Sequence, residues 1–165
     1  MPKTYEPCPK AVLTLVEKTI DAHHPDLRDA EVAVYCLFAI SDTGQAIMAH
    51  GYPALARIKI NKLEDRVAGF LDATMLIDKI AWEEMDDEGK AALVDHELEH
   101  LKVVIDKEGS LVTDDAGRPK LRIKKHDWQT GGFYSIAKRH QDKAHEVIQI
   151  AQVNAAFKQG ILQFG

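Results

Sequence analysis

Apolar residues recur every three or four positions in three stretches of the chain, which is the spacing of an amphipathic helix. The first stretch spans residues 11–24 and ends before Pro25, the second spans 91–106, and the third spans 133–158. An aspartate pair at 86–87 precedes the second stretch, and aspartate is favoured at a helix N-cap. The pattern therefore predicts three helices: one near the start, one central and one that closes the chain.

Stretches rich in β-branched and aromatic residues lie between these helices. Residues 31–41 form an apolar run that ends in a turn sequence, and they predict a buried strand. Residues 56–61 alternate apolar and charged side chains, which is typical of a half-exposed strand. Residues 73–80 predict another strand, whereas the preceding residues 63–71 also fit a helix.

A hairpin is predicted from residues 110–113 and 120–124, joined by a turn at 114–117. No internal repeat, low-complexity stretch or linker rich in Pro, Gly and Ser divides the chain. The order of helix, strands, central helix, hairpin and final helix predicts an α+β fold with a mixed or antiparallel sheet. We expect a single domain over residues 1–165.

Composition and charge narrow the classes of partner and the compartment. The chain of 165 residues is 45% hydrophobic and 28% charged, which is typical of one globular domain, and its formal charge is −5. This acidic balance gives no general attraction to nucleic acid or to an anionic membrane. The start of the chain has prolines and charges where a signal peptide needs an apolar core, and two cysteines cannot form a disulfide framework. The sequence therefore predicts a cytoplasmic protein.

One motif carries chemistry: His96-Glu97-Leu98-Glu99-His100, an HExxH sequence. On a helix, residues four apart lie on one face, so both imidazoles can reach one Zn²⁺ at roughly 2.0–2.1 Å. Glu97 projects about 100° around the helix axis, so it can address a zinc-bound water instead of binding the ion. The motif therefore predicts hydrolysis of a carbonyl substrate by a zinc-bound water, with Glu97 as the base.

The surroundings of the two histidines favour a metal site over a chance match. On a helical wheel, His96 and His100 share their face with Ala92, Leu93 and Val103, so we expect a largely buried helix with the histidines on an apolar side. Two buried imidazoles without partners would cost on the order of a few kcal/mol, and a shared metal ion removes that cost. A histidine pair satisfied within the core is the alternative.

Catalytic zinc takes three protein ligands, and Asp106 is the first candidate for the third. It lies ten residues after His96, where the metzincin pattern places its last ligand. That pattern needs a glycine that breaks the helix, and this chain has Val103 at that point. An unbroken helix would turn Asp106 toward solvent, so we reject it.

His126 is the better candidate for the third ligand. It follows the predicted strand at 120–124, so it could be held at the end of the hairpin, facing the helix. Asp127 beside it could orient an imidazole. The alternative is that residues 124–127 form a solvated turn.

The stretch from about residue 72 to residue 127 resembles the Putative phage metallopeptidase family, a zincin-like group that is also found in prophages. The residues that carry the resemblance are Asp72-Ala73 before an apolar strand, Trp82, Ala92-Leu93, the segment from His96 to Leu101, and His126-Asp127 after a hairpin. The resemblance implies His96, His100 and His126 as zinc ligands and Glu97 as the catalytic base. The resemblance does not supply a substrate. A zinc-dependent peptidase would act on a protein or peptide, and for a phage-encoded protein we expect the host cytoplasm.

Three further features are weighed for a role at the site. Tyr134 could donate a hydrogen bond to the oxyanion, although such a tyrosine is also common as an amphipathic core residue. Residues 72–80 could supply a sheet edge that binds substrate as an added strand, or they could form a plain core strand. The pair His23-His24 before Pro25 marks a helix end.

Three functions remain open from the sequence. The first is a zinc-dependent peptidase. The second is another zinc hydrolase, similar to the peptide deformylases, which take an upstream cysteine as a ligand; Cys36 is the candidate, but it lies in an apolar strand without a glycine-rich flank. The third is a non-enzymatic interaction protein on a zincin-like scaffold, with zinc structural or absent.

Overall fold

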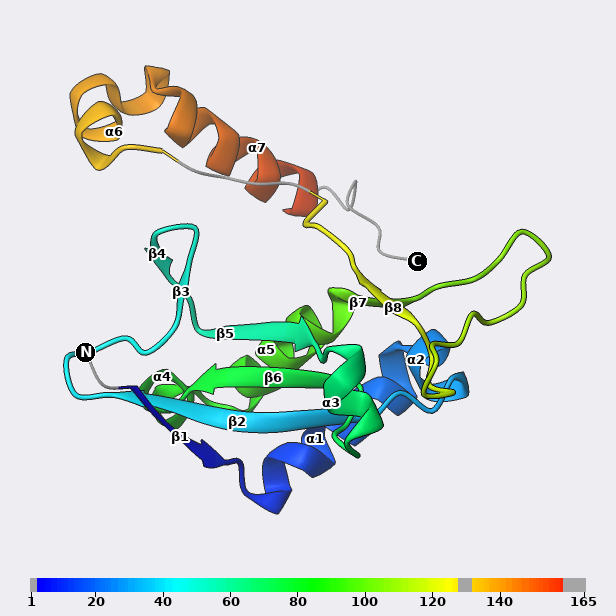
Figure 1. Cartoon of the computed structure of the whole chain (residues 1–165). Helices are drawn as coiled ribbons and strands as arrows, with labels where there is room; N and C mark the ends of the chain where they lie inside the picture. The colour runs from blue at the N-terminus through cyan, green and yellow to red at the C-terminus, as the bar shows by residue number, and fades with distance from the viewer. Residues whose placement is uncertain (1–2, 128–131, 159–165) are drawn as a thin grey trace. The chain divides into compact units, whose positions relative to one another are not determined.

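A computed structural model describes residues 3–127 and 132–158 (Figure 1). The contacts divide the chain into two compact units, Met1–Lys125 and His126–Gly165, and each unit is described by itself. The elements are helices and strands with one mixed sheet, so the predicted α+β class is confirmed. That residues 1–165 act as one domain stays a prediction.

A four-stranded sheet forms the centre of the first unit, in the order β1-β2-β6-β5 (Figure 1). Strands β2 and β6 are parallel, and the two outer strands pair antiparallel with them. The elements of this unit are β1 (Lys3–Pro7), α1 (Lys10–His23), α2 (Pro25–Asp29), β2 (Val34–Ser41), β3 (Met48–Ala49), β4 (Tyr52–Pro53), β5 (Ala56–Ile60), α3 (Leu63–Val67), β6 (Ala73–Asp78), α4 (Lys79–Glu84), α5 (Asp87–Glu99), β7 (Leu101–Val103) and β8 (Leu121–Ile123). The first predicted helix and the three predicted strands of the sheet are thus confirmed.

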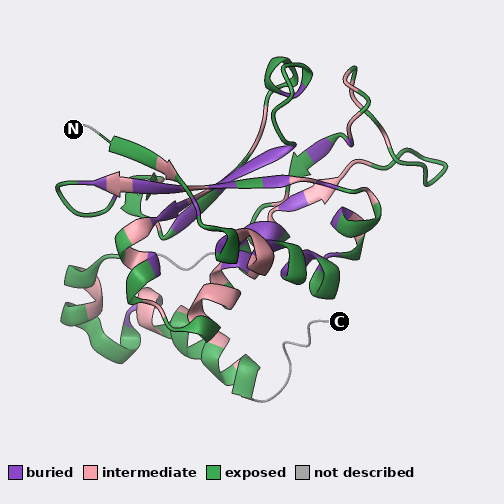
Figure 2. Cartoon of the chain, turned by 90° about the horizontal axis from the view of Figure 1, so that it is seen from below, coloured by how far each residue is buried: buried purple, intermediate pink, exposed green. Residues whose placement is uncertain are grey.

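The core of the first unit lies between one face of this sheet and helices α1 and α5. In β6, Met75 and Ile77 are fully buried, and Val94 and Leu98 of α5 are fully buried as well. Figure 2 shows the buried residues along the strands and on the helices that pack beneath them. Burial of this apolar surface fixes the face that α5 turns toward the sheet, and with it the direction of the HExxH side chains.

One outer strand of the sheet, β1, was not predicted. The proline-rich start forms β1, which pairs antiparallel with β2. Strand β6 has a partner on each side, so of the two alternatives for residues 72–80 the plain core strand is confirmed and the free sheet edge is wrong. Almost every residue of β6 is buried, as in a central strand, whereas β5 alternates buried and exposed residues. The sheet edge next to β6 therefore belongs to β5.

Helix α5 has the predicted cap, but it begins at Asp87 and ends earlier than predicted. The side chain of Asp86 caps it and accepts a hydrogen bond from the N–H of Gly89 at 2.7 Å. The helix ends at Glu99, with His100 as the C-cap, whereas a helix over 91–106 was predicted. The residues that follow include the β-branched run 103–105, and Leu101 is fully buried in strand β7, so pairing with β8 replaces further helical turns.

The predicted hairpin is correct in its turn and in its second strand, which is β8, but wrong in its first strand and in the pairing. The turn at 114–117 closes with a hydrogen bond from the N–H of Asp114 to the carbonyl of Arg118. Strand β8 pairs with β7, however, and residues 110–113 make only isolated bridges. Pro119 cannot donate to a ladder, and the buried side chains of Leu101 and Leu121 favour the β7–β8 pair.

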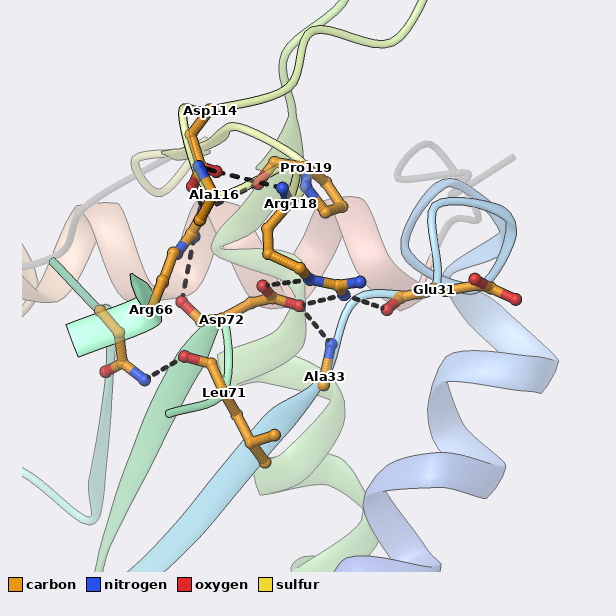
Figure 3. Close-up of polar contacts among 10 residues, drawn as sticks. Glu31, Ala33, Arg66, Leu71, Asp72, Asp114, Ala116, Arg118 and Pro119 are labelled. Carbon is orange, nitrogen blue, oxygen red and sulfur yellow. Dashed lines mark hydrogen bonds and ion pairs between the residues drawn. The ribbon is translucent and has the colours of Figure 1, made fainter. Parts of the chain in front are cut away.

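Two arginine–aspartate pairs fasten the segment before β8 to the sheet (Figure 3). The carboxylate of Asp72, which is 1% exposed, accepts hydrogen bonds from Nε and Nη2 of Arg118 at 3.0 and 2.7 Å. Arg66 is also buried, and its Nη1 donates to Oδ2 of Asp114 at 2.6 Å. Because each pair joins residues at least 46 positions apart, the network holds the segment that leads into β8.

The described residues of the second unit form the helix α6 (Tyr134–His140), the 3₁₀ helix η1 (Gln141–Lys143) and the helix α7 (His145–Lys158). A single helix over 133–158 was predicted, and this is wrong. The backbone of Gln141 has a φ of 49°, and Ala144 is extended, so the helix is interrupted twice. Ala144 is also buried, which favours packing at the break. Among the described residues, no helix is long and apolar enough to cross a membrane.

Candidate metal centre

The HExxH residues lie at the end of helix α5. His96 is in its last turn and His100 is its C-cap in a helical backbone conformation, so the two rings remain on one side, with ring centroids 5.2 Å apart. His96 is exposed and His100 is half-buried. The expectation that both histidines lie on an apolar side is therefore wrong, because Val94, Glu97 and Leu98 form the buried face instead. An accessible pair suits a site that must admit an ion.

The backbone of Lys124, the residue after β8, fixes which nitrogen of His100 can bind a metal ion. Nδ1 of His100 lies 2.7 Å from the carbonyl oxygen of Lys124. A carbonyl can only accept, so Nδ1 carries the hydrogen and donates it, and Nε2 is the ring nitrogen whose lone pair can bind a metal ion. The N–H of Lys124 donates in return to the carbonyl of His100 at 2.7 Å. Such a carbonyl partner is what orients metal-binding histidines in known sites.

His126 completes a group of three histidines. It follows Lys124 by two residues, so the strand that holds His100 also leads to His126. One ligand nitrogen from each of His96, His100 and His126 lies within 4.8 Å of the others. The prediction that these three side chains come together is therefore met by the geometry, although the hairpin that was expected to place His126 is built differently.

These residues fit a zinc ion in number and in chemistry. Three neutral imidazoles are a common ligand set for zinc, and the hydrogen bond of His100 sets the required tautomer. Ligand nitrogens around tetrahedral zinc lie about 3.3 Å apart. Binding of the ion would bring these nitrogens, which lie within 4.8 Å of one another, to that shorter spacing.

Glu97 is buried beside this cluster and is held by the sheet. Its side chain is 5% exposed, and it accepts a hydrogen bond from the backbone N–H of Ile58 in β5. Burial raises the pKa of the Glu97 carboxyl above its ordinary value, while the nearby His100 imidazole and the Ile58 N–H oppose that rise. A carboxyl with a raised pKa next to candidate ligands is suited to proton transfer.

The rejection of Asp106 rested on an incorrect premise, because the helix that was expected to turn it toward solvent ends at Glu99. Asp106 instead organises a turn: its Oδ1 accepts from the N–H groups of Glu108 and Ser110 at 3.0 and 2.8 Å. Cys36 is 1% exposed within β2, and burial raises the pKa of its thiol to about 12. Neither residue belongs to the described group that could hold a metal ion.

Two further predictions concern residues of the second unit. Tyr134 is the first residue of α6 and is 97% exposed, so the alternative that it is a core residue does not hold in the described part of the chain. Its role as an oxyanion donor stays a prediction, and so does the role of Asp127 in orienting an imidazole.

Sequence reasoning missed two backbone groups, the carbonyl of Lys124 and the N–H of Ile58. Both act on the motif from distant positions in the chain, and both are present whatever the side chain is. No pattern of residue types could have revealed them. Only the pairing of β7 with β8 and the packing of α5 against β5 bring them to the site.

Comparison with known proteins places the chain in a family. A sequence model of the Putative phage metallopeptidase family matches residues 3–158. The match extends well beyond the stretch of about 72–127 in which the resemblance was noted. No curated protein and no solved structure matches the chain. Because the match covers nearly the whole sequence, the chain belongs to the Putative phage metallopeptidase family.

Proposed function

We propose that this chain is a zinc-dependent metallopeptidase of zincin-like architecture, and that residues 1–165 act as one domain. His96, His100 and His126 would hold the ion, and Glu97 would be the general base. The observation that carries the proposal is the hydrogen bond from Nδ1 of His100 to the carbonyl of Lys124, because it prepares Nε2 as a ligand within a cluster of three imidazoles. Membership of the family supports a peptidase at a coarser level.

The metal ion and the residues around it would have separate roles in peptide hydrolysis. Zinc, when bound, supplies Lewis acidity toward a carbonyl oxygen and lowers the pKa of a coordinated water. Glu97 would accept a proton at its carboxylate and return it to the leaving amine. The Ile58 N–H and the buried surroundings restrict the orientation of this carboxylate, which favours proton transfer along one direction.

The substrate would be a protein or peptide bound along the outer edge of β5, which pairs with no strand in the described part of the chain. The carbonyl of Leu55 and the N–H of Asn61 bond to the β6 side, so alternation along the strand turns the backbone of Ile58 toward the outer edge. The carboxylate of Glu97 meets the strand at this edge. An extended peptide added there would run past the proposed base.

Removal of zinc tests the proposal. We expect the zinc-loaded protein to cleave a fluorescence-quenched peptide library, a chelator to abolish cleavage, and added zinc to restore it. The variant His100→Ala should lose zinc, from about one ion per chain to near none, together with cleavage, whereas His50→Ala, an exposed histidine of the β3–β4 turn, should keep both. Cleavage that persists in metal-free protein would refute the proposal. Zinc binding without any cleavage would favour the interaction protein.

A further inference from the structure

His24 is a buried histidine that takes no part in the candidate ligand set. It lies between α1 and α2, where it is the C-cap of the first helix and the N-cap of the second. Its side chain is 2% exposed, although neighbouring His23 is exposed. A polar ring in such a position needs partners to offset the loss of water.

The partners of His24 lie on the last turn of α5. Nε2 of His24 is 2.7 Å from Oδ1 of Asp95, and since a carboxylate only accepts, Nε2 carries the donated hydrogen. Nδ1 is buried and lies 3.7 Å from Oε2 of Glu99, beyond hydrogen-bond distance. The imidazole is thus inserted between two carboxylates that are four residues apart on one face of the helix.

Each of these carboxylates directly precedes a candidate ligand. Asp95 comes before His96, and Glu99 comes before His100. The two carboxylates therefore lie one above the other along the helix, and the two histidines lie beside them on the same turn. This turn is the end of the helix, where backbone carbonyls lack intrahelical partners and the chain frays most readily. A contact that holds Asp95 and Glu99 in place therefore also restricts the positions of His96 and His100.

Glu99 also connects the end of α5 to the segment after β8, which leads to His126. Its Oε1 accepts from Nζ of Lys124 at 3.0 Å and lies 3.3 Å from Nζ of Lys102. Lys124 is also the residue whose carbonyl orients His100. Asp95 and Glu99 are about half exposed, so each ion pair alone contributes little to stability. The ring of His24 is buried, so its position is fixed by the surrounding core.

We infer that His24 is a positioning residue of the metal centre: by bonding to Asp95 from the α1–α2 corner, it holds the last turn of α5 in the conformation that brings His96 and His100 to one ion. The inference rests on the proposed metal site. It assigns the N-terminal helices a part in metal affinity, besides their part in the core.

The test measures zinc affinity by competition with a chromophoric chelator, together with thermal unfolding of the metal-free protein. We expect His24→Leu to weaken zinc binding about 10–100-fold. Because the loss of a buried polar ring could also disturb the fold, Asp95→Ala removes the same contact from its half-exposed side and should give a similar loss of affinity. His24→Gln, whose amide can replace the Nε2 donor, should restore most of the affinity, and His23→Leu should leave it unchanged.

Hydrogen exchange of the backbone amides at 96–100 in metal-free protein gives a second readout. We expect faster exchange in His24→Leu and Asp95→Ala than in His24→Gln. Wild-type affinity in folded His24→Leu and Asp95→Ala would overturn the inference, and so would equal losses in His24→Leu and His24→Gln. Absence of zinc binding in the wild type would instead overturn the metal site itself, so the two failures are distinguishable.

Discussion

Asp72→Ala is expected to lower the free energy of unfolding of the metal-free protein by about 3 kcal/mol. The carboxylate is 1% exposed and accepts three hydrogen bonds, two from Arg118 and one from the N–H of Ala33 at 2.8 Å. Its removal leaves a guanidinium and a backbone N–H without their acceptor. It also loosens the segment before β8 (Figure 3). Lys124, whose carbonyl is the partner of His100, directly follows that strand. Urea denaturation followed by far-ultraviolet circular dichroism measures the change.

An exposed ion pair of the same chemistry provides the control. Asp29 pairs with Arg28 at 3.0 Å, but the side chains are 71% and 47% exposed, so Asp29→Ala should change the free energy of unfolding by less than about 0.5 kcal/mol. A loss below about 1 kcal/mol in Asp72→Ala would contradict the account of the buried network.

Glu97→Gln is expected to reduce cleavage of the quenched peptide library by about 10²–10⁴-fold. Glutamine keeps the size of the side chain and can still accept the hydrogen bond from Ile58, but it cannot take up a proton. The bound zinc per chain should stay as in the wild type, because Glu97 is not among the three candidate ligands. Loss of cleavage with retained zinc is therefore the signature of a general base.

The same chemical change at the other end of the helix serves as the control. Glu88 is exposed in the first turn of α5, and Glu88→Gln should cleave at the wild-type rate. If Glu97→Gln also cleaved at the wild-type rate, Glu97 would not be the base. Loss of zinc in Glu97→Gln would show that it has a structural role in the site.

The sequence was sufficient to predict those elements that depend only on residues close together in the chain. The first helix, the alternating strand β5 and the Asp86 cap of α5 each depend on residues within a few positions, and each was predicted. The HExxH motif was equally local, because it requires only that two histidines lie one turn apart. Periodicity and capping are short-range effects, and a single sequence contains them in full.

The end of α5 shows where such reasoning fails. The apolar spacing continues to residue 106, yet the chain leaves the helix at His100 because a distant strand, β8, offers backbone partners to residues 101–103. The same event creates the contact between His100 and Lys124. The early end of α5, which the sequence did not predict, is therefore also what brings His100 to the carbonyl of Lys124.

His24 illustrates a second limit. From the sequence, the pair His23-His24 marks only a helix end, and nothing distinguishes one histidine from the other. The fold buries His24 against Asp95, 71 residues away, and leaves His23 exposed. Such a long-range pairing depends on how α1 packs on α5, which periodicity within either helix does not specify.

The most direct test of the central claim is anomalous X-ray diffraction at the zinc edge from crystals of the zinc-loaded protein. We expect one anomalous peak per chain, at about 2.0–2.1 Å from a ring nitrogen of each of His96, His100 and His126, with Nε2 as the ligand atom of His100. A peak held by other residues, or no peak beside these rings, would contradict the assignment of a three-histidine metal centre.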